Sequence, residues 1–320
     1  MTRAARRIEP IFSVGCQRSG TTFLGSLLGA SAQAVSIPEA QFVADLAPDG
    51  DPASPIDLHR LIGAIEGHYR YGIWNFDLEG ARPPEVQGPY ADGIRWLAGR
   101  YAAAQGKRGV RRWIDHQPGH VREMGRLLAH FPDLKAVHII RDGRAVAASL
   151  LPLDWGPNGI YSAAHFWTQR VAFGLALRNY LGPERYIEAR YEDIVLQPEA
   201  ELRRLSQFLG IAYSPAMLEG GGFKAPAFTQ AQHSLVGTAP QVDRLASWRT
   251  TLGARQIEIF EYLAGPLLTY LGYDTLCGPE PRRPSLKEKV LLTVSDQVRV
   301  GLNAVAFKRR VTRFVARPGG

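Results

Sequence analysis

A glycine-bounded loop near the N-terminus is the part of the sequence most suited to chemistry. Residues 11–14 are apolar and predict a buried strand; the spacing Gly15-x4-Gly20 follows, and a helix is predicted at residues 21–29. A strand, loop and helix in this order direct backbone N–H groups and the positive end of the helix at one point. The sequence therefore predicts a phosphate- or sulfate-binding loop.

The loop differs from a nucleoside-triphosphate loop at one decisive position. Thr21 stands where such a loop carries the lysine that reaches the β- and γ-phosphates. The nearest cation is Arg18, two residues before Gly20. We therefore expect the anion cradle to be kept and the triphosphate chemistry to be lost.

A second strand–helix junction carries an arginine and a serine eight positions apart. The predicted strand at residues 136–140 ends before Arg141, and Asp142 is placed to cap the helix that follows. In open α/β sheets, ligands bind beyond the carboxyl ends of the strands, which is where Arg141 and the loop at Arg18 both fall. Ser149 then lies about two turns along the helix, so Arg141 and Ser149 could share one anion.

The elements that must position these residues alternate between strand and helix. Strands are predicted at residues 11–14, 34–36, 112–114, 136–140 and 186–189. Helices are predicted at residues 21–29, 58–71, 90–104, 121–130, 145–150, 161–181, 199–209 and 254–271. This alternation predicts a three-layer α/β fold with a mostly parallel central sheet flanked by helices, interrupted by an insertion at about residues 40–109.

The sequence Arg-Ser-Gly-Thr-Thr at residues 18–22 resembles the 5′-phosphosulfate loop of sulfotransferases that use 3′-phosphoadenosine 5′-phosphosulfate (PAPS). Arg141 and Ser149 resemble the pair that binds the 3′-phosphate in that family. Over about residues 9–275 the chain resembles these enzymes, and its motifs are most similar to those of the tyrosylprotein (Golgi-type) and bacterial members. The resemblance implies a P-loop nucleotide-hydrolase-like fold, PAPS as co-substrate without a metal, and sulfuryl transfer to a hydroxyl or amine.

The resemblance also assigns the donor contacts. They are Arg18, Ser19, Gly20, Thr21, Thr22, Arg141, Ser149 and, near the adenosine or its 3′-phosphate, Tyr191. Glu192 and Asp193 are expected to cap the helix after Tyr191. The family often adds a basic residue from a loop before the tryptophan equivalent to Trp248; this chain has none there, and Ser234 or Thr238 could serve instead.

Sulfuryl transfer requires a base for the acceptor proton, and two residues could supply it. Glu39 follows the second predicted strand and matches the catalytic glutamate of the tyrosylprotein type. His116 lies two residues before Pro118 and matches the catalytic histidine of the cytosolic type. Protonated His116 could alternatively stabilise charge while Glu39 takes the proton. Arg18 and the loop amides are expected to stabilise the developing negative charge.

Two other function classes remain open at this point. The first is a small-molecule kinase on the same fold, which ATP hydrolysis or Mg²⁺ dependence would reveal. The second is a non-catalytic protein that binds anionic ligands, in which replacing Glu39 or His116 would change no activity. The acceptor, whether small molecule, glycan or peptide, cannot be read from the sequence, and no nucleic-acid partner is expected.

The charge of the chain is concentrated at its C-terminus. Residues 281–320 contain ten basic and two acidic residues, so this segment carries the whole formal net charge of +8. We expect a sulfotransferase domain at residues 1–278, then a linker and a basic amphipathic tail at residues 279–320. The apolar stripe of the tail (Leu286, Val290, Val294, Val298, Leu302 and Val305) either packs on the domain or lies on an anionic membrane or partner.

Localisation is predicted from the cysteines and the hydropathy. Cys16 and Cys277 are too few for a disulfide framework, which is typical of a reducing compartment. We expect no segment to approach the roughly 18 consecutive apolar residues of a membrane span. These features favour a cytoplasmic protein, with membrane association through residues 281–320 as the option that the tail allows.

Overall fold

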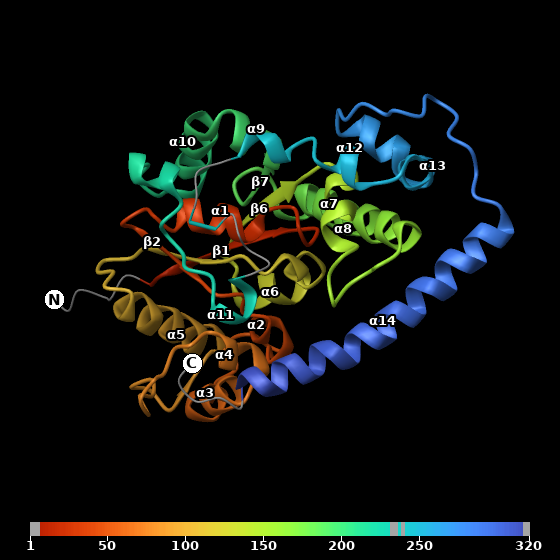
Figure 1. The fold of residues 1–320 in the computed structure, drawn as a ribbon. Coiled ribbons are helices and arrows are strands. Elements are labelled where there is room, and N and C mark those ends of the chain that lie inside the picture. The colour runs from red at the N-terminus through yellow and green to blue at the C-terminus, as the bar shows by residue number, and fades with distance from the viewer. Residues whose placement is uncertain (1–6, 231–235, 238–240, 316–320) are drawn as a thin grey trace.

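A parallel five-stranded sheet forms the centre of the protein (Figure 1). The computed structural model describes residues 7–230, 236–237 and 241–315. The strand order is β2-β5-β1-β6-β7, and every pairing is parallel. The strands are β1 (Glu9–Gly15), β2 (Ala34–Ile37), β5 (Arg112–Asp115), β6 (Lys135–Ile140) and β7 (Tyr186–Arg190). All five predicted strands are therefore confirmed, and each is at least one residue longer than predicted.

Helices cover both faces of this sheet, because neighbouring strand residues point in opposite directions. Ile11 packs with one helical layer and Phe12 with the other. The first layer contains α1 (Thr21–Leu28), α9 (Tyr191–Leu196) and α10 (Pro198–Leu209). The second contains α3 (Leu58–Glu66), α5 (Tyr90–Ala104) and α6 (Met124–His130). The predicted three-layer α/β fold is confirmed.

A third apolar cluster lies beyond β6. It is built by α7 (Gly143–Leu150), α8 (Ile160–Leu181) and α13 (Ala254–Tyr270). Asp142 caps α7 as predicted, since its side chain accepts a hydrogen bond from the Arg144 amide (2.9 Å). Arg144 then pairs with Glu261 of α13 (2.6 Å), and the two buried side chains tie α7 to α13.

The insertion between β2 and β5 is a helical subregion with a small hairpin. It contains α2 (Phe42–Asp45), α3, α4 (Tyr69–Ile73) and α5, with β3 (Ile56–Asp57) paired antiparallel to β4 (Gln87–Gly88). The single helix predicted at residues 58–71 is wrong. α3 ends at Glu66 with Gly67 as its C-cap, and His68 caps α4 by accepting a hydrogen bond from the Arg70 amide (3.2 Å).

Short helical turns complete the domain. The helix predicted at residues 121–130 begins later, because a 3-10 turn, η1 (Pro118–Arg122), precedes α6. After α10 come η2 (Pro215–Glu219), α11 (Ala227–Gln230), η3 (Val242–Arg244) and α12 (Trp248–Thr251). These turns bring residues from distant parts of the chain to the carboxyl end of the sheet.

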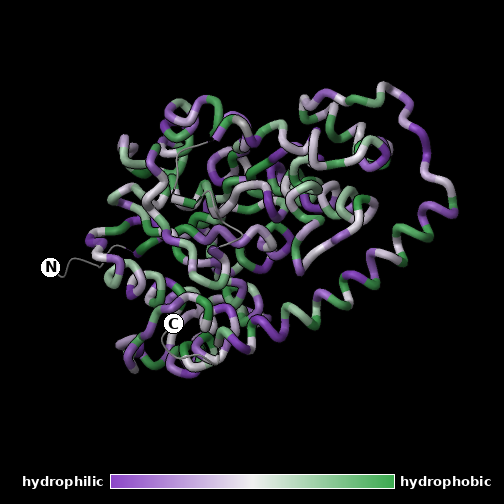
Figure 2. Tube along the Cα trace, viewed as in Figure 1, coloured by the Kyte–Doolittle hydropathy of each residue, from purple (hydrophilic) through white to green (hydrophobic). Residues whose placement is uncertain are grey.

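The C-terminal helix α14 (Leu286–Val315) runs along the outside of the molecule, past α8 to α4 (Figure 1). Apolar and polar residues alternate along it (Figure 2). By length and composition alone, Leu286–Phe314 could cross a membrane: its most apolar stretch of 18 residues has a mean hydropathy of 1.2 and is 6% buried. The expectation that no segment approaches a membrane span is therefore wrong for this helix.

Candidate active site

The β1–α1 loop has a backbone that only glycine accommodates at two points. Gly20 has φ 103°, and a Cβ atom there would lie 2.6 Å from Cδ2 of Tyr191. Gly15 has φ 151°, and a Cβ atom there would lie 2.5 Å from the Ile139 carbonyl oxygen. The buried Ser19 hydroxyl has no hydrogen-bond partner among the described residues. Together with the free N–H groups of the first turn of α1, it is available to a ligand.

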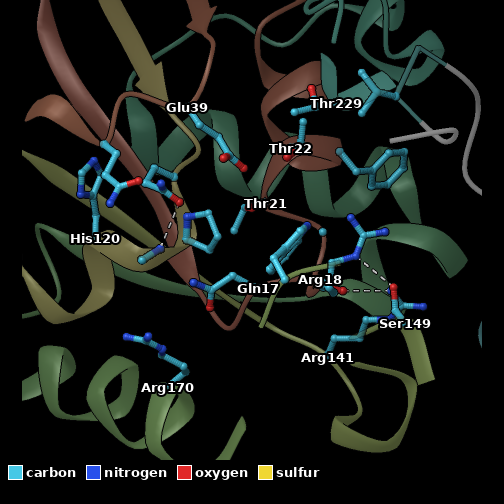
Figure 3. Close-up of a pocket in the computed structure, with 18 of the residues that line it drawn as sticks. Gln17, Arg18, Thr21, Thr22, Glu39, His120, Arg141, Ser149, Arg170 and Thr229 are labelled. Carbon is cyan, nitrogen blue, oxygen red and sulfur yellow. Dashed lines mark hydrogen bonds between the residues drawn. The ribbon is translucent and has the colours of Figure 1, made fainter. Parts of the chain in front are cut away.

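The two predicted anion motifs meet at this loop (Figure 3). Arg18 Nε donates a hydrogen bond to Ser149 Oγ of α7 (3.0 Å). Arg141, directly after β6, donates to the Arg18 carbonyl oxygen (3.1 Å), and its guanidinium carbon lies 4.3 Å from the centre of the Tyr191 ring. The junctions β1–α1, β6–α7 and β7–α9 therefore converge at the point where a shared anion is predicted.

The groups around Arg18 shift its pKa in opposite directions. Burial and the neighbouring Arg141 lower the pKa of Arg18, whereas Glu39 and Tyr191 raise it. A cluster of two guanidinium groups is stabilised by an anion between them. The geometry therefore favours a bound phosphate or sulfate here.

Glu39 faces the loop from the other side of the cavity. It follows β2, and its carboxylate lies 3.2 Å from Nη1 of Arg70 on α4. The indole of Trp74 donates to the Glu39 carbonyl oxygen (3.3 Å), which fixes the backbone. In Figure 3 the Glu39 carboxylate points toward the side of α1 that carries Thr21 and Thr22. A carboxylate held in this way can accept a proton from a group bound between it and the two threonines.

His116, the other candidate base, is buried almost completely. It is 1% exposed, and neither ring nitrogen has a hydrogen-bond partner among the described residues. Burial lowers the pKa of His116, and Glu39 and Asp115 offset this only in part. His116 lines a small cavity of about 20 Å³, together with Glu39 and Thr22. The lowered pKa favours a neutral imidazole, which argues against a protonated His116 that stabilises charge.

One large cavity, of about 630 Å³, connects the anion loop with Glu39. Among the described residues, seven arginines and three acidic residues line it, an excess of four positive charges. The arginines are Arg18, Arg70, Arg122, Arg141, Arg170, Arg244 and Arg310. Although residues 1–280 are formally neutral, the site itself is strongly cationic and suits an anionic ligand.

A histidine–aspartate pair beside this cavity was not predicted from the sequence. His120 Nε2 donates a hydrogen bond to the fully buried Asp115 (2.9 Å), and His120 lines the large cavity. The signal was the segment Asp-His-Gln-Pro-Gly-His at residues 115–120, in which the 3-10 turn brings position 120 back to Asp115. Asp115 also accepts from the Gln117 amide (2.9 Å), so protein groups already hold its carboxylate.

The remaining predictions from the sequence concern a helix cap, a substitute for a basic contact, and a metal. The predicted helix cap by Glu192 and Asp193 is wrong: both lie in the first turn of α9, but no side chain of the described residues caps this helix by a hydrogen bond. Glu192 instead accepts hydrogen bonds from the Asp142 amide (3.0 Å) and the Tyr273 hydroxyl (2.9 Å). Ser234 and Thr238, the possible substitutes for a basic contact, lie outside the described residues. Within the described ranges, no group of three or more His, Cys, Asp or Glu residues could hold a metal ion.

Solved structures share the fold. A sulfotransferase domain from the Synechococcus PCC 7002 olefin synthase superposes with a TM-score of 0.55. The comparison covers 83% of this chain and 94% of that domain at 22% sequence identity, which is evidence for the fold alone.

The chain is also similar in sequence to known sulfotransferases. The chain is 25% identical over 199 residues to protein-tyrosine sulfotransferase A of Caenorhabditis elegans, covering 59% of this chain and 51% of that protein. It is 31% identical over 192 residues to human carbohydrate sulfotransferase 2, covering 46% and 36%. The chain thus spans about half or less of the length of these relatives. The model of the Sulfotransferase family matches residues 10–215, and the chain belongs to that family.

Proposed function

We propose that the protein transfers a sulfuryl group from PAPS to a hydroxyl group of an acceptor. The observation that supports this most directly is the hydrogen bond between Arg18 and Ser149, which joins the two anion motifs into one site. Glu39 faces this site across a cationic cavity. Membership of the Sulfotransferase family supports the same reaction.

The residues present suit PAPS as the donor. The unpartnered Ser19 hydroxyl and the backbone N–H groups at the start of α1 form a cradle for the 5′-phosphosulfate, with Thr21 and Thr22 as further donors. Arg141 and Ser149 are placed to hold the 3′-phosphate beside Tyr191. When bound, PAPS supplies the sulfuryl group and a stable phosphate leaving group.

In the proposed reaction a bond forms between the acceptor oxygen and sulfur. The bond between sulfur and the bridging oxygen of the phosphosulfate breaks, and the acceptor proton passes to Glu39. Arg18 and the loop amides stabilise the negative charge that builds on the transferred group and the departing phosphate. The pairing of Glu39 with Arg70 orients the carboxylate toward the acceptor side.

Glu39 is the favoured base because it lines the large cavity and His116 does not. We propose that His116 instead fills the space behind the anion loop, where it touches the Phe223 ring (4.7 Å between centroids). A kinase is disfavoured by the threonine at position 21 and by Asp115, whose carboxylate is engaged by His120 and the Gln117 amide.

The proposal is tested with donor carrying ³⁵S. Tyrosine peptides and oligosaccharides are the first acceptors to offer, since the relatives named above are a protein-tyrosine and a carbohydrate sulfotransferase. We expect transfer of label to one class, lost in Glu39→Gln and kept in His116→Asn. If phosphate from γ-labelled ATP is transferred instead, the protein is a kinase.

A further inference from the structure

The C-terminal helix α14 presents its apolar stripe to solvent. Eight large apolar residues of this helix are between 39% and 79% exposed. They are Leu286, Val290, Leu291, Val294, Val298, Val300, Leu302 and Val305. This is the reverse of a helix docked on a domain by its apolar face. The predicted packing of this helix on the domain is therefore confirmed, since α14 contacts α8 and α4, but the contact is not made by the apolar stripe.

The polar side of α14 is the side that holds the domain. Asp296 is 7% exposed and accepts a hydrogen bond from the Asn158 amide (2.7 Å). Arg299 donates to the Asn158 carbonyl oxygen (3.1 Å), and Asn303 donates to the Leu153 carbonyl oxygen (3.2 Å). These contacts lie one turn apart and fix the rotation of the helix, so specific hydrogen bonds hold the stripe outward.

The charges on the outward side have one sign. Lys287, Lys308, Arg309 and Arg313 are exposed. The two acidic residues of the helix are both turned to the domain: Glu288 pairs with Arg255 (3.0 Å), and Asp296 is buried against the loop before α8. An exposed apolar stripe accompanied by cations alone is complementary to an anionic lipid surface.

We propose that α14 lies in the surface of an anionic membrane and anchors the protein there, with the stripe in the boundary between headgroups and acyl chains. A membrane-crossing arrangement is disfavoured, although the helix is long enough. Crossing would require Asp296 and Arg299 to leave their partners on the domain and enter hydrocarbon. An interfacial helix keeps every one of these contacts.

The same helix reaches the candidate active site. Phe307 and Arg310 line the large cavity, and Arg310 also pairs with Asp154 (3.0 Å). The ring of Phe228, another cavity residue, lies 6.2 Å from the ring of Phe307 and 4.4 Å from the guanidinium carbon of Arg310. One face of α14 thus belongs to the cavity wall while the other meets the lipid.

The test is co-sedimentation of the full chain with vesicles of phosphatidylcholine alone or with a quarter of phosphatidylserine. We expect binding to the anionic vesicles and a roughly tenfold weaker partition for the triple variant Val294→Gln, Val298→Gln and Leu302→Gln. The matched control, Val86→Gln, Tyr180→Gln and Leu196→Gln, removes three apolar groups of similar exposure outside α14 and should bind like the parent protein.

The charges are tested in the same way. Lys308→Gln, Arg309→Gln and Arg313→Gln should weaken binding to anionic vesicles, whereas Arg60→Gln, Arg100→Gln and Arg108→Gln, which remove three exposed cations elsewhere, should not. Circular dichroism and the melting temperature verify that each variant is folded.

Three results would overturn the proposal. The parent protein could fail to bind anionic vesicles, or each α14 variant could bind as well as its control. Light scattering could also show a dimer that the stripe variant converts to a monomer, in which case a second copy of the chain covers the stripe. None of these results depends on donor binding, so the proposed sulfuryl transfer stands or falls separately.

Discussion

Arg18 Nε donates a hydrogen bond to Ser149 Oγ across 3.0 Å, although 131 positions separate the two residues. The contact joins the loop after β1 to the helix after β6, two strands that are neighbours in the sheet. Because both junctions lie at the carboxyl edge, a ligand with two anionic groups can touch both at once. The predictions below rest on this arrangement.

Ser149→Ala should weaken the binding of 3′-phosphoadenosine 5′-phosphate (PAP) about 10- to 100-fold. The reason is the loss of one hydrogen bond to a charged group, which contributes about 1.5–3 kcal/mol. Isothermal titration calorimetry with PAP and with AMP measures the effect. AMP lacks the 3′-phosphate, so its affinity should hardly change; an equal loss for AMP would place Ser149 at the 5′ end instead.

Gly20→Ala should abolish donor binding and destabilise the fold by about 1–3 kcal/mol, because φ 103° and the contact with Tyr191 both exclude a side chain. The matched control is Gly63→Ala in α3, where an added Cβ meets nothing within 4 Å. That change should stabilise the protein by about 0.5–1 kcal/mol. Urea unfolding measures both, and a Gly20→Ala protein of unchanged stability would contradict the account of the loop.

Glu39→Gln should leave PAP affinity within about twofold and lower kcat about 10²- to 10⁴-fold, since it removes the base but keeps the size and polarity of the side chain. Single-turnover kinetics with the identified acceptor separates the two effects. His116→Asn is the comparison. If His116→Asn lowers kcat and Glu39→Gln does not, the roles of the two residues are reversed.

The buried His138 should make stability depend on pH. Burial lowers its pKa to about 4, with Glu188 raising it and Arg178 lowering it further, from an ordinary value of about 6.5. Between these two values the unfolded chain takes up a proton that the folded protein does not. Stability is therefore retained above about pH 6.5 and falls as the pH drops, by about 2 kcal/mol between pH 7 and pH 5.

The variant His138→Gln tests this dependence. Its free energy of unfolding, measured with urea at pH 7 and pH 5, should fall less on acidification than that of the parent protein, by about 2 kcal/mol. Nδ1 of His138 bonds the Tyr186 hydroxyl (2.9 Å), so the variant will also be less stable at pH 7. An unchanged difference between the two pH values would show that other groups set the acid sensitivity.

The sheet and the anion motifs could be predicted because their signals are local. Each central strand is buried on both faces and therefore reads as a short apolar run, as at residues 136–140. Glycine spacing and the Arg141–Ser149 separation likewise depend on positions close in sequence. The helix break at Gly67 was missed because the apolar period continues across it.

Features that depend on tertiary contacts could not be read in this way. His120 becomes part of the cavity only because the turn after β5 folds it onto Asp115. The period of α14 revealed an apolar stripe, but periodicity cannot tell which side faces the domain. That choice is made by Asp296, Arg299 and Asn303, whose partners lie about 140 or more positions earlier in the chain.

The central claim is a donor site that needs both anion motifs, and the most direct test is the melting temperature of the protein with PAP, ATP or AMP. At a PAP concentration about 100-fold above Kd, we expect a stabilisation of about 2.7 kcal/mol, much larger than with ATP or AMP and lost in Arg141→Ala. Equal stabilisation by ATP and PAP, or an effect of PAP that survives Arg141→Ala, would contradict the account.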